Sequence, residues 1–199
     1  MSVDFYFDFS SPYAYLAAMK MDDIAMWHGR EVTWRPILLG PIMERTGAGT
    51  VFDKPLKGIY LKRDVARTAR LFGLPEVRYP EPFPFAALAA CRAFYWLEAK
   101  DPNMAVSLAQ RLFREAYGEG RPIASGEDVA KVAERMYVDS HELLAAIETP
   151  AIKARLKAEV DKALQAGVVG VPFVIAEGEP FWGADKLEQI SRWLDTGGW

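Results

Sequence analysis

Cysteine and histidine are nearly absent from the sequence. Its 199 residues include one cysteine, Cys91, and two histidines, His28 and His141. A single cysteine excludes an internal disulfide and a Cys-x-x-Cys redox pair. Two histidines leave little material for a histidine-rich metal site or for a Ser-His-Asp triad. We therefore expect no metal site and no thiol–disulfide chemistry that relies on the chain's own cysteines.

The sequence also lacks an excess of one charge and a long hydrophobic run. Its 24 Lys and Arg residues nearly balance its 27 Asp and Glu residues, giving a net charge of −3, whereas nucleic-acid binding requires a clustered basic excess. No apolar run approaches the roughly 18–20 residues that cross a bilayer. An alternating segment begins at Val3 and leaves no room for a signal peptide. We expect a cytoplasmic protein that binds neither nucleic acid nor a membrane.

The sequence does contain enough apolar material for a core, since 51% of its residues are hydrophobic. Residues 3–9 alternate between apolar and polar side chains, which predicts a half-buried strand. Ser10-Ser11-Pro12 then offers hydroxyl caps and a proline for the start of a helix, and Gly29 ends the helical pattern. A second short strand follows at residues 32–35. Together these elements predict a β-α-β unit with a right-handed crossover.

The middle of the chain, residues 40–166, favours helix formers and contains no convincing strand. A proline-rich piece at residues 79–85 is predicted to be a rigid loop within this block, and Cys91 is expected in an apolar helix of the core. The predicted helical segments are residues 63–72, 86–99, 104–117, 126–136 and 140–166, the last with a breaker at Thr149-Pro150.

A β pattern returns after Gly167. Residues 168–175 form a continuous β-branched run, as expected for a fully buried strand. Residues 177–179 are predicted to turn the chain into a short return strand. Asp185 to Glu188 match a capping box, which places Asp185 at the N-cap of a last helix.

The order of these elements, β-α-β, then helices, then β-β-α, is that of the thioredoxin fold. We therefore predict an α/β, thioredoxin-like domain built from residues 1–39 and 167–199, with residues 40–166 inserted as an all-helical domain. Ser11-Pro12-Tyr13-Ala14 lies where redox members of this fold carry Cys-Pro-x-Cys, and Val171-Pro172 lies where they carry a cis-proline. Without those cysteines, a serine hydroxyl at a helix N-terminus can still donate a hydrogen bond to a bound thiolate.

Further motifs make this likeness more specific, and with them the chain resembles the 2-hydroxychromene-2-carboxylate isomerases. That family belongs with the kappa-class glutathione transferases, in the DsbA-like branch of the thioredoxin superfamily. The resemblance covers nearly the whole chain, including the helical insertion, and implies glutathione as the cofactor. The motifs are Asp8 to Leu16, Arg35 to Gly40, Lys57-x-x-Tyr60 with Asp64 and Arg67, Gly170 to Phe173, and Phe181 to Asp185.

The resemblance also implies roles for individual residues. The serine matching Ser11 is catalytic and holds the glutathione sulfur, and the pair matching Val171-Pro172 binds the cysteinyl backbone. The residues matching Ala184 and Asp185 hold the γ-glutamyl end of glutathione. A lysine matching Lys57 lies near the glycyl carboxylate.

Two positions depart from the family pattern. Ala48 and Ala86 occupy places where family members usually carry asparagines that contact glutathione or substrate. Each lost hydrogen bond should weaken or redirect binding by about 1 kcal/mol or more. Simple structural interpretations also remain open, because Ser11 and Asp185 could serve only as helix caps.

We expect a glutathione-dependent isomerase of a small aromatic carboxylate resembling 2-hydroxychromene-2-carboxylate, acting by reversible addition of the thiolate. One alternative is a glutathione transferase of the kappa type. Another is a non-catalytic, thioredoxin-like binding protein, which the two missing asparagines would favour. The six tryptophans and the aromatic loop also predict a homodimer.

Overall fold

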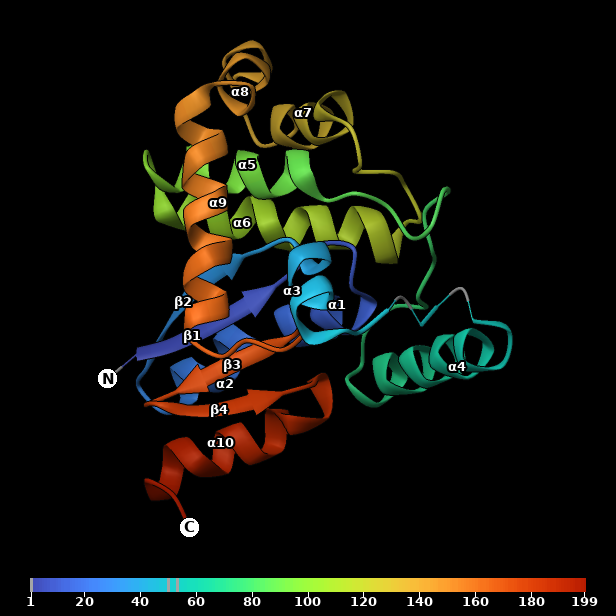
Figure 1. The fold of residues 1–199 in the computed structure, drawn as a ribbon, viewed down its shortest axis with the longest axis vertical. Coiled ribbons are helices and arrows are strands. Elements are labelled where there is room, and N and C mark those ends of the chain that lie inside the picture. Colours follow the sequence, from blue (N-terminus) through green and yellow to red (C-terminus); the bar gives the residue numbers. More distant parts are fainter. Residues whose placement is uncertain (1, 50, 53) are drawn as a thin grey trace.

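A mixed four-stranded sheet joins the two ends of the chain (Figure 1). The computed structural model describes residues 2–49, 51–52 and 54–199. The strand order is β2-β1-β3-β4, with β1 parallel to β2 and antiparallel to β3, and β3 antiparallel to β4. This arrangement confirms a thioredoxin-like sheet made from both termini. The strands are β1 (Ser2–Phe7), β2 (Glu31–Pro36), β3 (Phe173–Ala176) and β4 (Glu179–Trp182).

Strand β1 is more deeply buried than its alternating pattern predicts. Phe5 and Phe7 are fully buried, as expected for the apolar face. On the opposite face, however, Tyr6 is 6% exposed, and Asp8 just beyond the strand is 4% exposed. The half-buried strand is therefore a wrong prediction, because helices cover both faces of this short sheet.

The segment predicted as one helix between Pro12 and His28 is two helices, α1 (Pro12–Ala18) and α2 (Met21–Trp27). After the turn between them, α2 packs against β2. The indole N–H of Trp34 in β2 donates a hydrogen bond to the Asp22 carboxylate in α2 at 2.9 Å. Gly29 ends the pair with φ +65°, as the helix-stop prediction requires.

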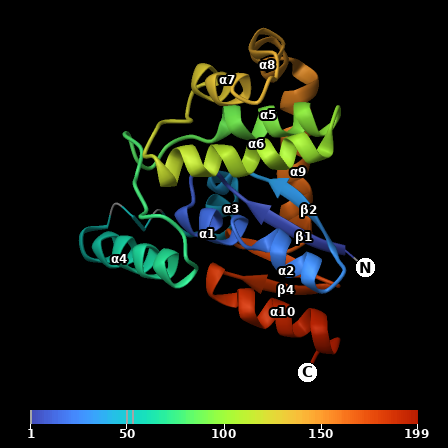
Figure 2. The same cartoon turned by 180° about the vertical axis from the view of Figure 1, so that it is seen from behind.

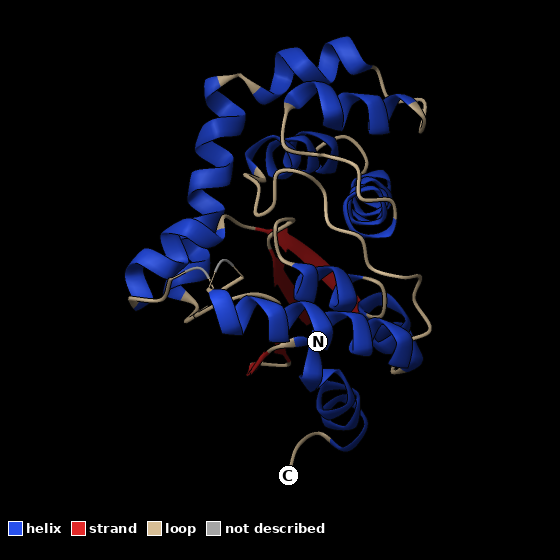
Figure 3. Cartoon of the chain, turned by 90° about the vertical axis from the view of Figure 1, so that its right-hand side faces the viewer, coloured by secondary structure: helices blue, strands red, loops and turns tan. Residues whose placement is uncertain are grey.

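Helices and the loops between them make up the described segment between β2 and β3 and surround the sheet (Figure 3). Every predicted helical segment is confirmed with shifted ends, and α3 is an addition. Within the described residues, no helix is long and apolar enough to cross a membrane. The helices are α3 (Leu39–Thr46), α4 (Pro55–Leu71), α5 (Leu88–Glu98), α6 (Pro102–Phe113) with a π-helical turn at Arg114–Gly118, α7 (Gly126–Glu134), α8 (Ser140–Ile147) and α9 (Pro150–Gln165).

The C-terminal segment departs from its prediction at two points. The strand expected over residues 168–175 begins only at Phe173, because the chain before it forms a loop with a cis peptide bond between Val171 and Pro172. The capping box is not formed either. Asp185 lies in a 3-10 turn (Ala184–Lys186), where its carboxylate pairs with the Lys186 Nζ at 2.9 Å, and α10 (Leu187–Thr196) follows without a side-chain cap.

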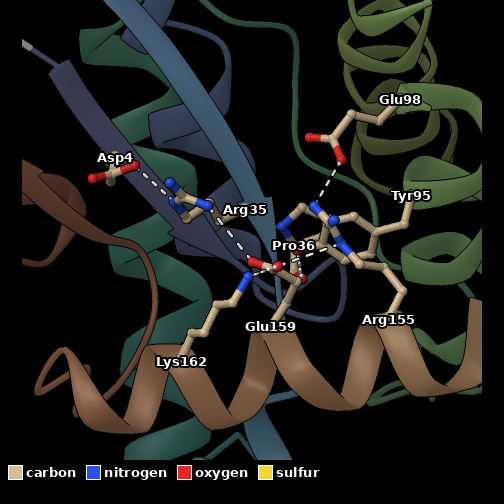
Figure 4. Close-up of polar contacts among 8 residues, drawn as sticks. All are labelled: Asp4, Arg35, Pro36, Tyr95, Glu98, Arg155, Glu159 and Lys162. Carbon is tan, nitrogen blue, oxygen red and sulfur yellow. Dashed lines mark hydrogen bonds and ion pairs between the residues drawn. The ribbon is translucent and has the colours of Figure 1, made fainter. Parts of the chain in front are cut away.

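A buried carboxylate ties α9 to the sheet. Glu159 is 1% exposed and points from α9 toward β2, between three basic side chains (Figure 4). Its carboxylate oxygens lie 3.6 Å from Arg35 Nη1, 3.3 Å from Arg155 Nε and 2.8 Å from Lys162 Nζ. Arg35 also pairs with Asp4 of β1 at 2.7 Å. This network connects the helical segment to both N-terminal strands across one face of the sheet.

We expect Glu159→Ala to lower the free energy of unfolding by about 2 kcal/mol. The cost arises because three cations lose a buried partner, and it is moderate because their side chains are 30–61% exposed and can regain water. Urea denaturation followed by circular dichroism measures this difference. Asp161→Ala, which removes a surface partner of Lys157 on the same helix, should leave the midpoint unchanged; an equal loss in both variants would contradict the assignment.

Candidate active site

A pocket of about 1080 Å³ lies beside the turn that follows β1. The turn after β1, the loop before β3 and the chain after β4 form one side of it. Helices α3 and α4 and the proline-rich loop form the other side. Ligand pockets usually measure about 300–1,000 Å³, so this one has room for more than one small ligand. It therefore joins segments from both ends of the chain with the helical insertion.

Ser11 lies at the start of α1 and lines the pocket. It is 8% exposed, and its Oγ accepts a hydrogen bond from the Ala14 N–H at 3.2 Å. Within the described chain, the hydroxyl donates to no acceptor, so its proton is available to a ligand. The capping interpretation of Ser11 is therefore confirmed and is compatible with a second role in binding.

The loop before β3 presents an unused backbone edge to the pocket. The Val171–Pro172 peptide bond is cis, and no hydrogen bond among the described residues uses the backbone N–H or C=O of Val171. The Pro172 carbonyl accepts a hydrogen bond from the Gly183 N–H at 3.0 Å. That bond holds Ala184 and Asp185 beside Val171, and all three residues line the pocket.

Gly170 permits close packing of this loop against β4. A Cβ atom at position 170 would lie 2.6 Å from Trp182 Nε1 and 2.8 Å from Cε2. We expect Gly170→Ala to displace the Trp182 indole or the loop, and so to lower the free energy of unfolding by about 1–3 kcal/mol. Urea denaturation measures the change. Gly118→Ala, where a Cβ meets no atom within 4 Å, is the control, and an equal loss of stability in the two variants would contradict this role.

Asp8 is a buried carboxylate in the lining that sequence reasoning did not single out. Its Oδ1 accepts the Ser10 N–H at 2.8 Å, and its Oδ2 accepts the Leu39 N–H at 2.6 Å. Asp8 thus ties the turn that carries Ser11 to the start of α3. Burial raises the pKa of Asp8, although both backbone hydrogen bonds oppose that rise. An Asp that bonds the N–H two residues later is a known turn pattern, which is the local signal that could have identified it.

The raised pKa of Asp8 gives a prediction for stability against pH. The folded state binds the Asp8 proton more tightly than the unfolded state does. The stability that this proton contributes is therefore complete below the ordinary carboxyl pKa of 3.8, and it is lost as pH rises through the raised pKa of the folded state. Relative to Asp8→Asn, the wild-type protein should therefore lose stability as pH increases above about 4. Urea denaturation of both proteins at several pH values measures this; a difference that does not vary with pH would contradict it.

Helix α4 is tied to α1 by a hydrogen bond across the pocket wall. The Tyr13 hydroxyl donates to Asp64 Oδ2 at 2.7 Å, and Arg67 pairs with the same carboxylate. Burial and the Asp64 carboxylate raise the pKa of Tyr13, so it stays protonated as the donor. Figures 1 and 2 show α4 at the side of the molecule, apart from α5–α8.

Lys57 is exposed on this helix and does not line the pocket, so its predicted place in the site is not observed.

Aromatic rings line the side of the pocket formed by the insertion. The Phe52 ring centroid lies 6.4 Å from that of Tyr13 and 5.4 Å from that of Phe83. Phe83 belongs to the proline-rich loop and packs against Tyr79 of the same loop, with the two ring centroids 4.8 Å apart. Because Phe83 also lines the pocket, the same loop can contact an aromatic ligand.

Comparisons with known proteins match this chain over nearly its whole length. A family model described as DSBA-like thioredoxin domain matches residues 2–195. The 2-hydroxychromene-2-carboxylate isomerase of Sphingobium xenophagum is 26% identical over 197 residues, covering 97% of each chain. Glutathione S-transferase kappa 1 of Homo sapiens is 23% identical over 205 residues, covering 97% of this chain and 90% of the relative. A solved structure of a 2-hydroxychromene-2-carboxylate isomerase superposes with a TM-score of 0.88 at 28% identity, covering 98% of this chain and 95% of the other.

Proposed function

The chain belongs to the family of DSBA-like thioredoxin domains, and from this premise we propose that it is a glutathione-dependent isomerase of a small aromatic substrate. The main support is that Ser11, with its free hydroxyl proton, and Val171, with its unused backbone N–H and C=O, line one pocket. The Ser11 hydroxyl would bind a sulfur atom, and the Val171 backbone would bind a peptide. Relatives named as isomerases of an aromatic compound and as glutathione transferases support the same proposal.

The residues of the pocket fit glutathione at its centre. Ser11 would hold the sulfur, and the N–H and C=O of Val171, beside Pro172, would pair with the cysteinyl backbone. Ala184 and the carboxylate of Asp185, whose side chain is 72% exposed, would hold the γ-glutamyl ammonium group. Lys57 could reach the glycyl carboxylate only from the solvent-exposed side, because it does not line the pocket.

When bound, glutathione would supply a nucleophilic thiol for reversible addition to a conjugated carbon of the substrate. Ser11 would donate a hydrogen bond to the sulfur and so favour the thiolate over the thiol. The backbone N–H and C=O of Val171 would orient the cysteinyl unit. Asp8 holds the turn that carries Ser11 in place through the Ser10 N–H. No histidine base is needed, which agrees with the composition of the chain.

A glutathione transferase is the second candidate, because it would use the same sulfur site and retain the adduct as product. The relatives of the kappa class favour this candidate. The homodimer and a cytoplasmic location also remain proposals. Product analysis after incubation with glutathione separates the two activities, since an isomerase returns the thiol unchanged.

Calorimetric titration with glutathione tests the proposal. We expect a dissociation constant of about 1 mM or tighter, together with the ultraviolet absorbance of a thiolate at neutral pH. Titration with S-methylglutathione should show binding without that absorbance. The absence of binding by both compounds would contradict the proposal and would favour a thioredoxin-like protein that binds other partners.

A further inference from the structure

Among the residues that the structure describes, the pocket beside Ser11 has no basic side chain in its lining. Among the described lining residues, the charged ones are Asp8, Asp64 and Asp185, and none is Lys, Arg or His. A carboxylate in this pocket would therefore find acidic groups and no cation.

The basic groups nearest to these acids are already engaged. Arg67 pairs with Asp64, which also accepts the Tyr13 hydroxyl. Lys186 pairs with Asp185 at the exposed edge. The two oxygens of Asp8 accept backbone N–H groups, and no cation pairs with this side chain in the described chain. Within the described lining, the donors at Ser11 and Val171 are those assigned above to glutathione, so a desolvated carboxylate elsewhere in the pocket would meet no cation.

The remaining lining is mostly apolar and partly aromatic. It includes Phe52 and Phe83, whose rings meet edge to face at 5.4 Å, and Leu61 of α4. Ala48 and Ala86, the positions of the two missing asparagines, also line it and present methyl groups there. Such a surface binds planar apolar molecules by burial of area and by ring contacts.

We infer that the aromatic co-substrate of this pocket is uncharged and carries no carboxylate, in contrast to a 2-hydroxychromene-2-carboxylate. This inference rests on the proposed function, since it assigns the space that glutathione would leave free. Glutathione would extend from Ser11 toward the exposed Asp185 at the pocket edge, whereas a small aromatic ligand would fill the apolar part of the lining. The co-substrate class is therefore a neutral conjugated aromatic, such as an aryl enone.

Two probes that differ in one group test the inference. Benzylideneacetone and benzylidenepyruvate share the phenyl ring and the enone, but the first ends in a methyl group and the second in a carboxylate. We expect the ketone to bind at least about tenfold more tightly, measured by fluorescence and calorimetric titration of the protein alone and with S-methylglutathione present. Equal affinities, tighter binding of the carboxylate, or no binding of the ketone would each overturn the inference.

Matched variants on α4 show whether the lining sets this preference. Leu61→Lys places an ammonium group at a lining position and should reduce the preference for the ketone at least about threefold by strengthening carboxylate binding. Leu56→Lys, at a residue of the same helix that is 83% exposed, should leave the preference unchanged. An equal effect of both variants would overturn the role of the lining.

The same titrations distinguish a failure of this inference from a failure of the proposed function. If S-methylglutathione and glutathione fail to bind while the ketone retains its preference, the glutathione proposal fails and the selectivity of the pocket stands. If glutathione binds but the carboxylate probe is preferred, the selectivity inference fails and the glutathione proposal stands.

Discussion

Replacing Ser11 by alanine is expected to lower kcat/KM for glutathione-dependent turnover by about 100-fold, the effect of deleting one preorganised hydrogen-bond donor to a developing anion. The hydroxyl is the side-chain donor that the structure leaves free at the proposed sulfur position. Its loss should also raise the pKa of the bound thiol, so that the thiolate absorbance at neutral pH decreases. Ser11→Thr retains a hydroxyl and should recover part of both properties.

The control for this variant must account for the helix cap. Ser11 Oγ caps α1 through the Ala14 N–H, so alanine should also cost about 1 kcal/mol of stability. Thr149→Ala removes a comparable cap from α9, where Oγ1 accepts the Ile152 N–H at 3.4 Å, far from the pocket in sequence and absent from its lining. That variant should lose similar stability and no activity. Full activity in Ser11→Ala, or an equal loss in Thr149→Ala, would contradict the catalytic assignment.

Elements with one buried face could be predicted from periodicity alone. The helical spacing of Leu187, Ile190, Trp193 and Leu194 predicts one buried face for α10, and there Leu187, Ile190 and Leu194 are buried and Trp193 is partly buried. By contrast, α3 begins at Leu39-Gly40-Pro41, where glycine and proline hide a helix start. Helix α4 begins at Pro55, and because Leu56 is 83% exposed, its first turns carry no amphipathic pattern. Helices of this kind depend on neighbours that are distant in the sequence.

The candidate site was predictable where its residues have local causes. Ser11 and Pro172 lie at positions marked by a helix cap and by a proline in an apolar run, and both line the pocket. For Asp8, the turn with the Ser10 N–H is a local pattern, whereas the second hydrogen bond, from the Leu39 N–H 31 residues away, is not visible in the sequence. The continuous apolar run 168–175 was predicted to be one strand because burial in a loop and burial in a sheet look alike in sequence.

The predicted division into residues 1–39 with 167–199 and residues 40–166 has a physical consequence that mutation can test. Phe7 of β1 is fully buried, and its ring centroid lies 5.4 Å from that of Trp34 in β2. It also lies 6.3 Å from the Phe94 ring of α5 and 5.6 Å from the Phe113 ring of α6. One side chain thus belongs at once to the core of the sheet and to the core of the helical insertion. Two independently stable domains would not share it.

We expect Phe7→Ala to lower the free energy of unfolding by about 3–5 kcal/mol, since it removes a fully buried ring and leaves a cavity between rigid neighbours. Phe7→Leu, which keeps most of the volume, should cost about 1.5 kcal/mol or less, and Met26→Ala, at a side chain that is 72% exposed, should change little. Urea denaturation followed by tryptophan fluorescence and far-ultraviolet circular dichroism should show one transition, whose midpoint shifts equally for both signals because Phe7 belongs to both cores. Circular dichroism reports mainly on the insertion, since most helices lie there. Two separated transitions, with only one displaced by Phe7→Ala, would instead mean that residues 40–166 fold independently of the sheet that carries Ser11.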